Sequence, residues 1–469
     1  MTLASLPPVR VALGCGGTGG HLFPGLAIAD QLVRRGCEVM LLISPKEVDQ
    51  QAVRGVSGME VVALPAVGLK RHGEIAFARG FARSYRAAAK LFKSCPPQAS
   101  LAMGGFTSAP PILAAKRVGA WTFLHESNTI PGRANRWLSW VVDHAFVGFP
   151  AAAGRLHNRS VTATGTPVRS CFQAREAAAC RAAIGLDPVR PVLLVMGGSQ
   201  GAGAINELVL QSLAPLASRL PEVQFFHLTG SGPFTEKLIQ AYAALKLKAV
   251  VHPFFADMHL ALGAATVAVC RAGASSLAEL AAMRVPAVLV PYPTASDNHQ
   301  FHNARAFEAT GSARLLEQKT ATPELLVQML SDLIEKSAVH ENIQSALAQW
   351  HSPHAAEQIA EAMLAVLGAG VGEGFRADRR AVAPLGSLTA ESEESPPRPF
   401  DPLCAHEPQA GPLTPALSPS EGERGNHRQI SGEPRFRNKT KPLAPPQAGR
   451  LRTRRTTVIR SPLLAGRGA

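Results

Sequence analysis

Residues 9–35, VRVALGCGGTGGHLFPGLAIADQLVRR, join a short apolar run, a glycine-rich loop and an amphipathic stretch. This pattern predicts a buried strand at Val9–Leu13 and a helix at Pro24–Arg35. The loop between them, Gly14–His21, contains five glycines. Glycine lets backbone N–H groups approach a ligand closely, and a helix N-terminus carries partial positive charge. The loop therefore suits a phosphate or a pyrophosphate.

The same strand, loop and helix unit recurs along the chain, which predicts an α/β fold of two Rossmann-like domains facing across a cleft. Strands are predicted at Val9–Leu13, Glu38–Ile43, Glu60–Leu64, Leu101–Met103, Thr122–His125 and His144–Val147 in the first half, and at Pro191–Met196, Gln224–Leu228, Ala249–His252, Val267–Cys270 and Ala287–Val290 in the second. A polar connection at Thr164–Pro188 lies between them. We place the boundary near Pro167, with domains at residues 1–167 and 168–354.

Two more glycine loops follow predicted strands of the second half, at Gly197–Ala202 and Cys270–Glu279. A diphosphate suits the helix start after the third loop, where Glu279 would accept hydrogen bonds from ribose hydroxyls. Simple helix capping by Ser275 and Ser276 is the alternative. A nicotinamide cofactor is disfavoured, because Ile43-Ser44-Pro45 stands where an acidic residue would end the second strand.

The formal net charge of +14 alone would suggest a nucleic-acid-binding protein. Residues 372–469 hold 16 Lys and Arg against 10 Asp and Glu, which leaves a net charge of +8 for residues 1–371. The same 98 residues contain 14 of the 37 prolines and no sustained hydrophobic period. We therefore expect a disordered basic, Pro-rich tail without assigned function, and no nucleic-acid partner.

The seven cysteines include no CxxC pair, so neither a disulfide framework nor a zinc site is indicated. A reducing, cytoplasmic environment fits this composition best. No basic stretch leads into an apolar run at the N-terminus, and nowhere do 18 apolar residues occur together. We expect a protein that is neither secreted nor membrane-spanning.

Seven longer segments occur in one order along the chain: GGTGGHLFPGLA (16–27), GGFTSAPPILAA (104–115), LHESNTIPGRANRWL (124–138), GTPVR (165–169), GGSQGAGAIN (197–206), CRAGASSLAEL (270–280) and DNHQFHNA (297–304). Together they resemble the MurG family of UDP-N-acetylglucosamine:lipid-linked muramyl-peptide transferases, over residues 9–365. The resemblance implies a fold of the glycosyltransferase B type, with the donor held mainly by the second domain. The lipid-linked acceptor would lie on the first domain, to which a last helix at 355–367 would return.

The activity implied by this resemblance is inverting transfer of N-acetylglucosamine from UDP-N-acetylglucosamine to the 4-hydroxyl of undecaprenyl-pyrophosphoryl-N-acetylmuramyl-peptide. The product, lipid II, belongs to peptidoglycan synthesis. Such a peripheral enzyme would act at the cytoplasmic face of the cell inner membrane.

The resemblance also implies the residues that bind the donor. They are Thr18, Gly19, Gly20, Asn128, Arg169, Ser199, Phe255, Ala274, Ser275, Ser276, Leu277, Ala278, Glu279, and either His299 or Gln300. Phe255 departs from the family, which has an aliphatic residue beside the uracil. The segment before Asp297 is one residue longer than in some relatives, so His299 and Gln300 compete for the same sugar contact.

Inverting transfer needs a base for the acceptor hydroxyl and positive charge for the departing UDP. His21, directly after the first glycine loop, is one candidate base, and Glu126 or a less conventional base is the alternative. A structural hydrogen-bonding role for this histidine also stays open. Arg169 and helix N-termini would supply the charge, since the chain has no Asp-x-Asp pair to hold a divalent metal. We therefore expect neither a metal nor another cofactor.

A membrane-embedded acceptor requires a surface that approaches the bilayer. Residues 68–90 interleave six basic residues with apolar ones, a composition that binds anionic headgroups: Lys70, Arg71, Arg79, Arg83, Arg86 and Lys90 with Leu69, Ile75, Phe77, Phe81 and Tyr85. An amphipathic helix packed on the sheet is the alternative. Nearby, Gly104–Thr107 forms a loop suited to the acceptor's pyrophosphate.

Three rival functions remain open from the sequence. The nearest is a related glycosyltransferase that uses a diacylglycerol or sterol acceptor. A UDP-sugar epimerase would convert UDP-N-acetylglucosamine without a lipid acceptor. A nucleic-acid-binding protein would leave the three phosphate-type loops unexplained.

Overall fold

The computed structural model describes residues 8–17, 19–54, 56–65, 74–197, 203–230 and 232–370. Among them, no helix is both long and apolar enough to span a bilayer. The sequence predictions for Thr18, Ser199, Lys70, Arg71 and the tail at 372–469 lie outside the described residues.

A seven-stranded parallel sheet forms the first domain, in the order β3-β2-β1-β4-β5-β6-β7. Its strands are β1 (Arg10–Gly14), β2 (Glu38–Ile43), β3 (Met59–Ala63), β4 (Ala99–Ala102), β5 (Trp121–Glu126), β6 (His144–Val147) and β7 (Val161–Ala163). The helical elements are α1 (Gly19–Arg34), α2 (Glu47–Ala52), α3 (Glu74–Ser94), α4 (Ala109–Arg117), α5 (Arg133–Leu138) and the 3-10 turn η1 (Pro150–Arg155). The strand order reverses between β1 and β4, so the loops after these two strands flank the position where such sheets bind ligands.

The second domain contains a six-stranded parallel sheet of the order β10-β9-β8-β11-β12-β13. Its strands are β8 (Val192–Met196), β9 (Gln224–Leu228), β10 (Ala249–His252), β11 (Val267–Cys270), β12 (Ala287–Leu289) and β13 (Arg314–Leu315). The helical elements are α6 (Ala177–Ala183), α7 (Gly203–Arg219), α8 (Phe234–Ala244), α9 (Met258–Ala264), α10 (Ala274–Met283), η2 (Ser296–Asn298), α11 (His299–Ala309), α12 (Pro323–Glu335) and α13 (Ser337–Trp350). Here the order reverses between β8 and β11, and the third glycine loop follows β11.

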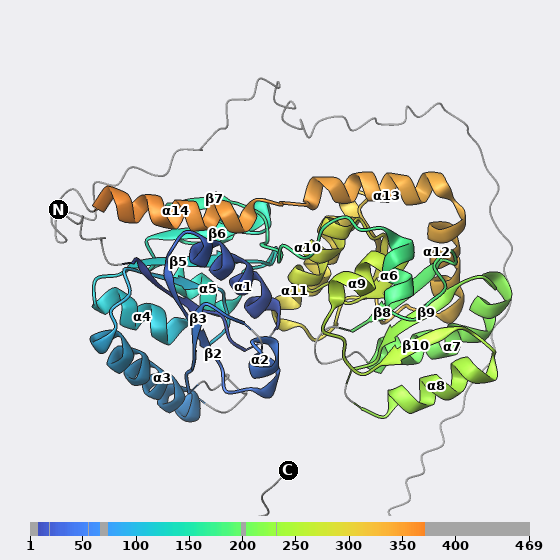
Figure 1. The fold of residues 1–469 in the computed structure, drawn as a ribbon, viewed down its shortest axis with the longest axis horizontal. Coiled ribbons are helices and arrows are strands. Elements are labelled where there is room, and N and C mark those ends of the chain that lie inside the picture. The colour runs from blue at the N-terminus through green and yellow to red at the C-terminus, as the bar shows by residue number, and fades with distance from the viewer. Residues whose placement is uncertain are drawn as a thin grey trace, which may run out of the picture. The chain divides into compact units, whose positions relative to one another are not determined.

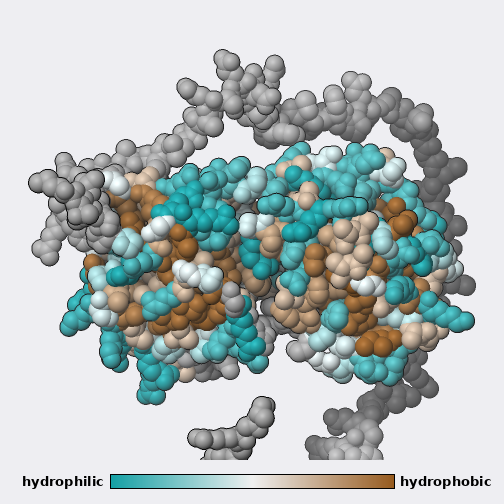
Figure 2. Space-filling model, in the orientation of Figure 1, coloured by the Kyte–Doolittle hydropathy of each residue, from teal (hydrophilic) through white to brown (hydrophobic). Residues whose placement is uncertain are grey.

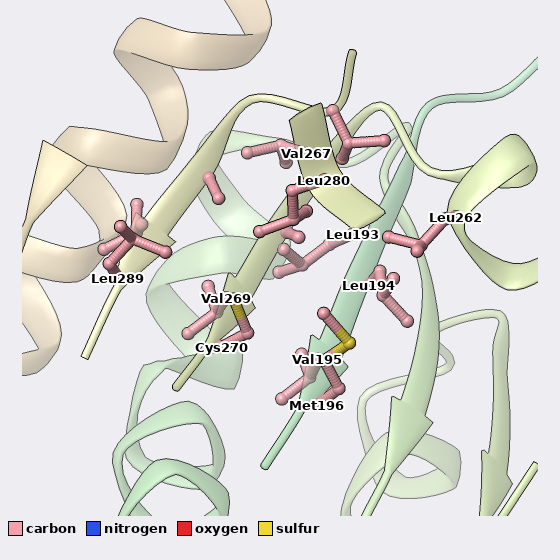
Figure 3. Packing of buried hydrophobic residues seen from close by; sticks show 14 of the residues in the cluster. Leu193, Leu194, Val195, Met196, Leu262, Val267, Val269, Cys270, Leu280 and Leu289 are labelled. Carbon is pink, nitrogen blue, oxygen red and sulfur yellow. The ribbon is translucent and has the colours of Figure 1, made fainter. Parts of the chain in front are cut away.

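Continuous burial explains why the central strands were recognisable from sequence. All five residues of β8 and all four of β11 are buried, because helices cover both faces of a parallel sheet. Figure 3 shows their side chains packed with Leu262 of α9 and Leu280 of α10. The eleven predicted strands are present within one or two residues, and the two-domain α/β fold is confirmed.

Two edge strands, β7 and β13, were missed because they are short and only partly buried, which leaves no apolar run to read. The first helix also begins earlier than predicted, at Gly19 rather than Pro24. Pro24 lies inside the helix, where it removes one backbone hydrogen bond without ending the helix, so it did not mark the boundary.

The last described helix, α14 (Ala355–Gly370), packs against α1 of the first domain (Figure 1). Its buried residues Ile359, Ala360 and Met363 belong to the apolar cluster of the first sheet. Arg35, directly after α1, pairs with Glu357 at 3.0 Å and with Glu361 at 2.8 Å. Helix α14 is thus held by both apolar packing and charge.

Candidate active site

The first glycine loop connects β1 to α1 and lies tightly against its neighbours. A side chain at Gly16 would place its Cβ 2.3 Å from the Ser44 nitrogen, so only glycine fits. Gly17 has a φ of +112° and donates its N–H to Asp49 Oδ2 at 2.6 Å. The Gly17 N–H of this glycine loop is therefore already paired with a carboxylate of the protein, that of Asp49. Asp49 is fully buried on the short helix α2, and no motif in the sequence pointed to it.

His21 lies in the first turn of α1, against the loop that follows β4. Gly104 lies so close to His21 that a Cβ atom added at Gly104 would be only 2.8 Å from His21 Cε1. Gly104 and Gly105 also both have positive φ. Burial lowers the pKa of His21 below its ordinary 6.5, while the negative charge of Glu126 opposes the shift. A backbone hydrogen bond with Met103 also opposes the shift, and Nδ1 of His21 is buried. The imidazole is therefore neutral at neutral pH and able to accept a proton.

Glu126, at the end of β5, is buried, and its carboxylate accepts four hydrogen bonds. The donors are the N–H and Nδ2 of Asn128 at 2.8 and 3.0 Å, the N–H of Gly132 at 2.9 Å and Nδ2 of Asn135 at 2.9 Å. The carboxylate thus organises the whole loop between β5 and α5. Asn128, a predicted donor ligand, is one of its partners.

Arg169 and Glu279 are two ionisable residues of the second domain that the sequence predicts at the candidate site. The Arg169 guanidinium lies between two rings, 4.6 Å from the centroid of Phe23 on α1 and 5.1 Å from that of Phe172. Its Nε is buried and, among the described residues, has no hydrogen-bond partner. Desolvation raises the pKa of Glu279 to about 7, while the charge of Arg169 lowers it. The sequence did not indicate that Phe23, from the first domain, would contact this arginine.

The predicted run Ala274–Glu279 forms the first turns of α10. Its N-cap is Gly273, without a side-chain cap, so Ser275 and Ser276 do not cap this helix. Instead, the Ser275 hydroxyl donates to the Gly20 carbonyl of α1 at 3.0 Å. That carbonyl lacks its usual helical partner because the residue four positions later, Pro24, has no N–H. The proline thereby leaves an acceptor for a contact between the two domains.

A second set of contacts between the domains centres on Asn303 of α11, which is completely buried. Its Oδ1 accepts from the N–H and the hydroxyl of Thr129, both at 2.9 Å, and its Nδ2 donates to Asn128 Oδ1 at 3.0 Å and to the Ala272 carbonyl at 3.2 Å. Asn303 thus joins the loop after β5 to the loop before α10. Its segment, DNHQFHNA, had been singled out by sequence, whereas this asparagine had not.

The remaining predicted donor residues lie in the second domain. Phe255 is half-buried, with its ring edge-on to Phe226 at 5.1 Å and stacked on His252 at 6.0 Å. His299 and Gln300 begin α11, where His299 Nδ1 contacts the Ser296 carbonyl at 2.7 Å and Gln300 Oε1 accepts the Tyr292 N–H at 2.9 Å. The charge of His299 also lowers the pKa of His21.

Helix α3 carries the basic and apolar surface predicted at residues 68–90. Arg79, Arg83, Arg86 and Lys90 are exposed, and Ile75 is 71% exposed. A groove of about 620 Å³ lies beside them, lined by Phe81, Ala82, Tyr85, Leu113, Lys116 and Arg117. Figure 2 shows hydrophobic and hydrophilic residues alternating over the described surface.

Aromatic rings connect this groove to the loop around His21. Phe106 directly follows Gly105 and meets Phe77 edge-on at 5.2 Å, and Phe77 lies 6.1 Å from Phe81. The rings of Phe106, Phe77 and Phe81 therefore form an aromatic path from the loop beside His21, along α3, to the groove. Among the described residues, no cluster of three or more His, Cys, Asp or Glu side chains is arranged to hold a metal ion.

Two parallel sheets, each with its strand order reversed beside the central strand, form the two-domain fold of the glycosyltransferase B type. Residues 11–147 match the glycosyltransferase family 28 N-terminal domain, and residues 192–359 match the family 28 C-terminal domain. The chain belongs to glycosyltransferase family 28 and, within it, to the MurG family.

Relatives of known name support this assignment. The UDP-N-acetylglucosamine--N-acetylmuramyl-(pentapeptide) pyrophosphoryl-undecaprenol N-acetylglucosamine transferase of Nitratidesulfovibrio vulgaris (strain Hildenborough) is 38% identical over 370 residues, covering 76% of this chain and 98% of that protein. The enzyme of the same name from Anaeromyxobacter dehalogenans (strain 2CP-1) is 32% identical over 402 residues, covering 84% of this chain and 100% of that protein. The crystal structure of Acinetobacter baumannii MurG matches with a TM-score of 0.59 and 28% identity, over 76% of this chain and all of that one.

Proposed function

We propose that this enzyme transfers N-acetylglucosamine from UDP-N-acetylglucosamine to the 4-hydroxyl of a muramyl-peptide linked through pyrophosphate to undecaprenol. The product would be lipid II, a precursor in peptidoglycan synthesis. The observation that carries the proposal is that named relatives align along both domains, with His21 on one and Arg169 with Glu279 on the other. We further propose the domain division at Pro167, with residues 168–354 holding the donor.

Electrostatics of the second domain support the proposed donor site. The partly desolvated Arg169 and the backbone N–H groups at the start of α10 would stabilise the negative charge of the departing diphosphate. Glu279, one turn further along α10, would accept hydrogen bonds from the ribose hydroxyls. Because these groups supply positive charge and the chain lacks an Asp-x-Asp pair, we expect activity without a divalent metal.

For the base, the geometry favours His21 over Glu126. Burial favours the neutral form of the His21 imidazole, which can accept a proton, whereas the Glu126 carboxylate already accepts four hydrogen bonds. We propose that His21 accepts the proton of the acceptor hydroxyl as it attacks the sugar. Glu126 would instead position the surrounding loop, including Asn128.

The surface of α3 supports a membrane-bound acceptor. Its exposed arginines would bind anionic lipid headgroups, and the adjacent groove would accept apolar groups. The aromatic path from the groove to Phe106 ends beside Gly105, next to His21. We therefore propose peripheral attachment at the cytoplasmic face of the inner membrane, with the acceptor reaching the site along α3 and no nucleic-acid partner.

The direct test is incubation with labelled UDP-N-acetylglucosamine and the lipid-linked muramyl-pentapeptide, with and without a chelator. We expect label in the lipid product and most of the activity to persist after thorough chelation. Transfer only to a diacylglycerol or sterol acceptor would identify a related glycolipid transferase, and epimerised nucleotide sugar without lipid product would identify an epimerase. Activity restored only in proportion to added magnesium would contradict the expected metal independence.

A further inference from the structure

The segment that leads into α11 has an unusual backbone. Asp297 and Asn298 are consecutive non-glycine residues in the left-handed region, with φ values of 50° and 53°. Each such residue is held against an intrinsic preference for other conformations, so the surrounding contacts must maintain the turn. The next two residues are His299 and Gln300, and their side chains are hydrogen-bonded within the same segment. The direction of both side chains therefore depends on this turn.

The charged partners of Asp297 in the described structure come from the other domain. Arg136 Nη2 donates to Asp297 Oδ2 at 2.9 Å, and Arg133 Nη2 lies 3.8 Å from Asp297 Oδ1. Both arginines belong to α5, which follows the loop organised by Glu126. The side chains of Arg136 and Asp297 are 42% and 29% exposed, so this ion pair is partly screened by water.

The backbone at Arg136 is fixed by helix α5, in which the Arg136 N–H donates to the Gly132 carbonyl at 2.9 Å. The neighbouring Asn135 donates to the Glu126 carboxylate at 2.9 Å and to the His125 carbonyl at 3.1 Å. One and a half turns into α11, Asn303 bonds to Thr129 of the same loop. The first domain therefore contacts α11 at two points, before its first turn and within its second.

A partly exposed ion pair contributes little to the free energy of unfolding. We therefore expect the pair of Arg136 and Asp297 to affect mainly the local conformation of the turn. We propose that Arg136 is a positioning residue for sugar-donor binding: by pairing with Asp297 across the domain boundary, it holds the left-handed turn that directs His299 and Gln300. This inference rests on the proposed function, because it assumes that His299 or Gln300 contacts the donor.

The experiment compares Arg136→Ala, Arg136→Asp, Asp297→Arg and the charge-swapped double variant in the full-length chain. We expect Arg136→Ala to raise the KM for UDP-N-acetylglucosamine about tenfold, with the acceptor KM and the melting temperature nearly unchanged. Each single charge reversal should raise the donor KM further. The double variant should bring it back within about threefold of wild type, and nearly equal melting temperatures in all variants would show that the change in KM is not a loss of folded protein.

Arg34→Ala is the matched control, because Arg34 pairs with Asp30 at the same distance of 2.9 Å but within α1. It should leave the donor KM unchanged. A donor KM within twofold of wild type in Arg136→Ala, or no rescue in the double variant, would overturn the proposal. Titration of every variant with UDP-N-acetylglucosamine alone measures the dissociation constant of the donor without turnover. The same loss in the single variants and the same rescue in the double variant are expected in this constant. If wild-type enzyme transfers no sugar, the proposed function fails while this binding comparison still decides the role of Arg136.

Discussion

At the residue scale, the proposed site depends on ionisable groups that are only partly exposed to water. Burial lowers the pKa of His21 and raises that of Glu279 to about 7, and both shifts favour the neutral form. The Arg169 guanidinium lies near the rings of Phe23 and Phe172, where cation–π attraction compensates part of its lost hydration. These three residues therefore allow the most direct tests.

Replacing Glu279 by alanine should raise the KM for UDP-N-acetylglucosamine by about ten- to a hundredfold and leave the acceptor KM almost unchanged. The ribose hydroxyls would donate to the ionised form of Glu279, which is present from about pH 7 upward. Hydrogen bonds to such a charged group are worth about 1.5–3 kcal/mol. UDP affinity and thermal unfolding are measured on the same variant. An unchanged affinity with a lowered melting temperature would reject Glu279 as a donor ligand.

The raised pKa of Glu279 also predicts how stability depends on pH. Between its ordinary value of 4.5 and about 7, the folded state retains a proton that the unfolded state releases. The stabilising contribution is therefore fully present below pH 4.5 and is lost as the pH rises to about 7. Relative to Glu279→Gln, the wild-type free energy of unfolding should fall over this window in denaturant titrations at several pH values. A difference that does not vary with pH would show that the carboxyl group is not desolvated.

His21→Asn should lower kcat by about a hundredfold or more, with the donor KM nearly unchanged, because it removes a base without touching the nucleotide. Glu126→Gln is the comparison: an amide cannot accept all four hydrogen bonds, so its melting temperature should fall as well. If Glu126→Gln lost kcat at an unchanged melting temperature while His21→Asn stayed active, Glu126 would be the base.

At the element scale, helices α1, α11 and α3 differ in the contacts that they make with neighbouring segments. Helix α1 contains Pro24, which frees the Gly20 carbonyl for Ser275 of α10. Helix α11 begins after a left-handed turn and is anchored by Asn303. Helix α3 buries one face against the sheet and leaves its arginines exposed. Amphipathic α3 therefore serves both the core and the proposed membrane surface.

Charge reversal of Arg79 and Arg83 should weaken binding to vesicles that contain anionic lipid, since each basic residue near such a surface contributes about 1 kcal/mol. Activity on a short, water-soluble acceptor analogue should survive. Reversal of Arg219 and Lys237, exposed on the second domain, is the charge-matched control and should leave vesicle binding unchanged. Equal loss on both acceptors would indicate that α3 has only a structural role.

At the scale of the whole molecule, two sheets have the same parallel architecture, their helices α1 and α10 are joined by the Ser275–Gly20 hydrogen bond, and α14 returns from the second domain to the first. The buried residues of α14 end at Val366, before the basic segment starts. Since residues 372–469 show no core-forming pattern, their deletion should leave folding and transfer activity within about threefold of wild type. Steady-state kinetics and thermal unfolding of the shortened chain check this. A loss above about tenfold would show that the segment has a function.

Sequence by itself determined the parallel α/β fold, since strands covered on both faces leave continuous apolar runs such as Val192–Met196. It also located most glycine loops, because only glycine fits where another backbone approaches closely, as at Gly16, or where φ is positive, as at Gly104. The motif strings then identified the family. Each of these signals is local, so it can be read along the chain.

Only the tertiary structure decided how these local units act on one another. The Asp49 carboxylate paired with Gly17, the Phe23 ring beside Arg169, and the pairing of Arg136 with Asp297 each join residues from separate segments of the chain. Hydrogen bonds, ring contacts and desolvation act over a few ångströms in space. Pairs such as Arg136 and Asp297 are 161 positions apart in the sequence, so no local pattern records their contact.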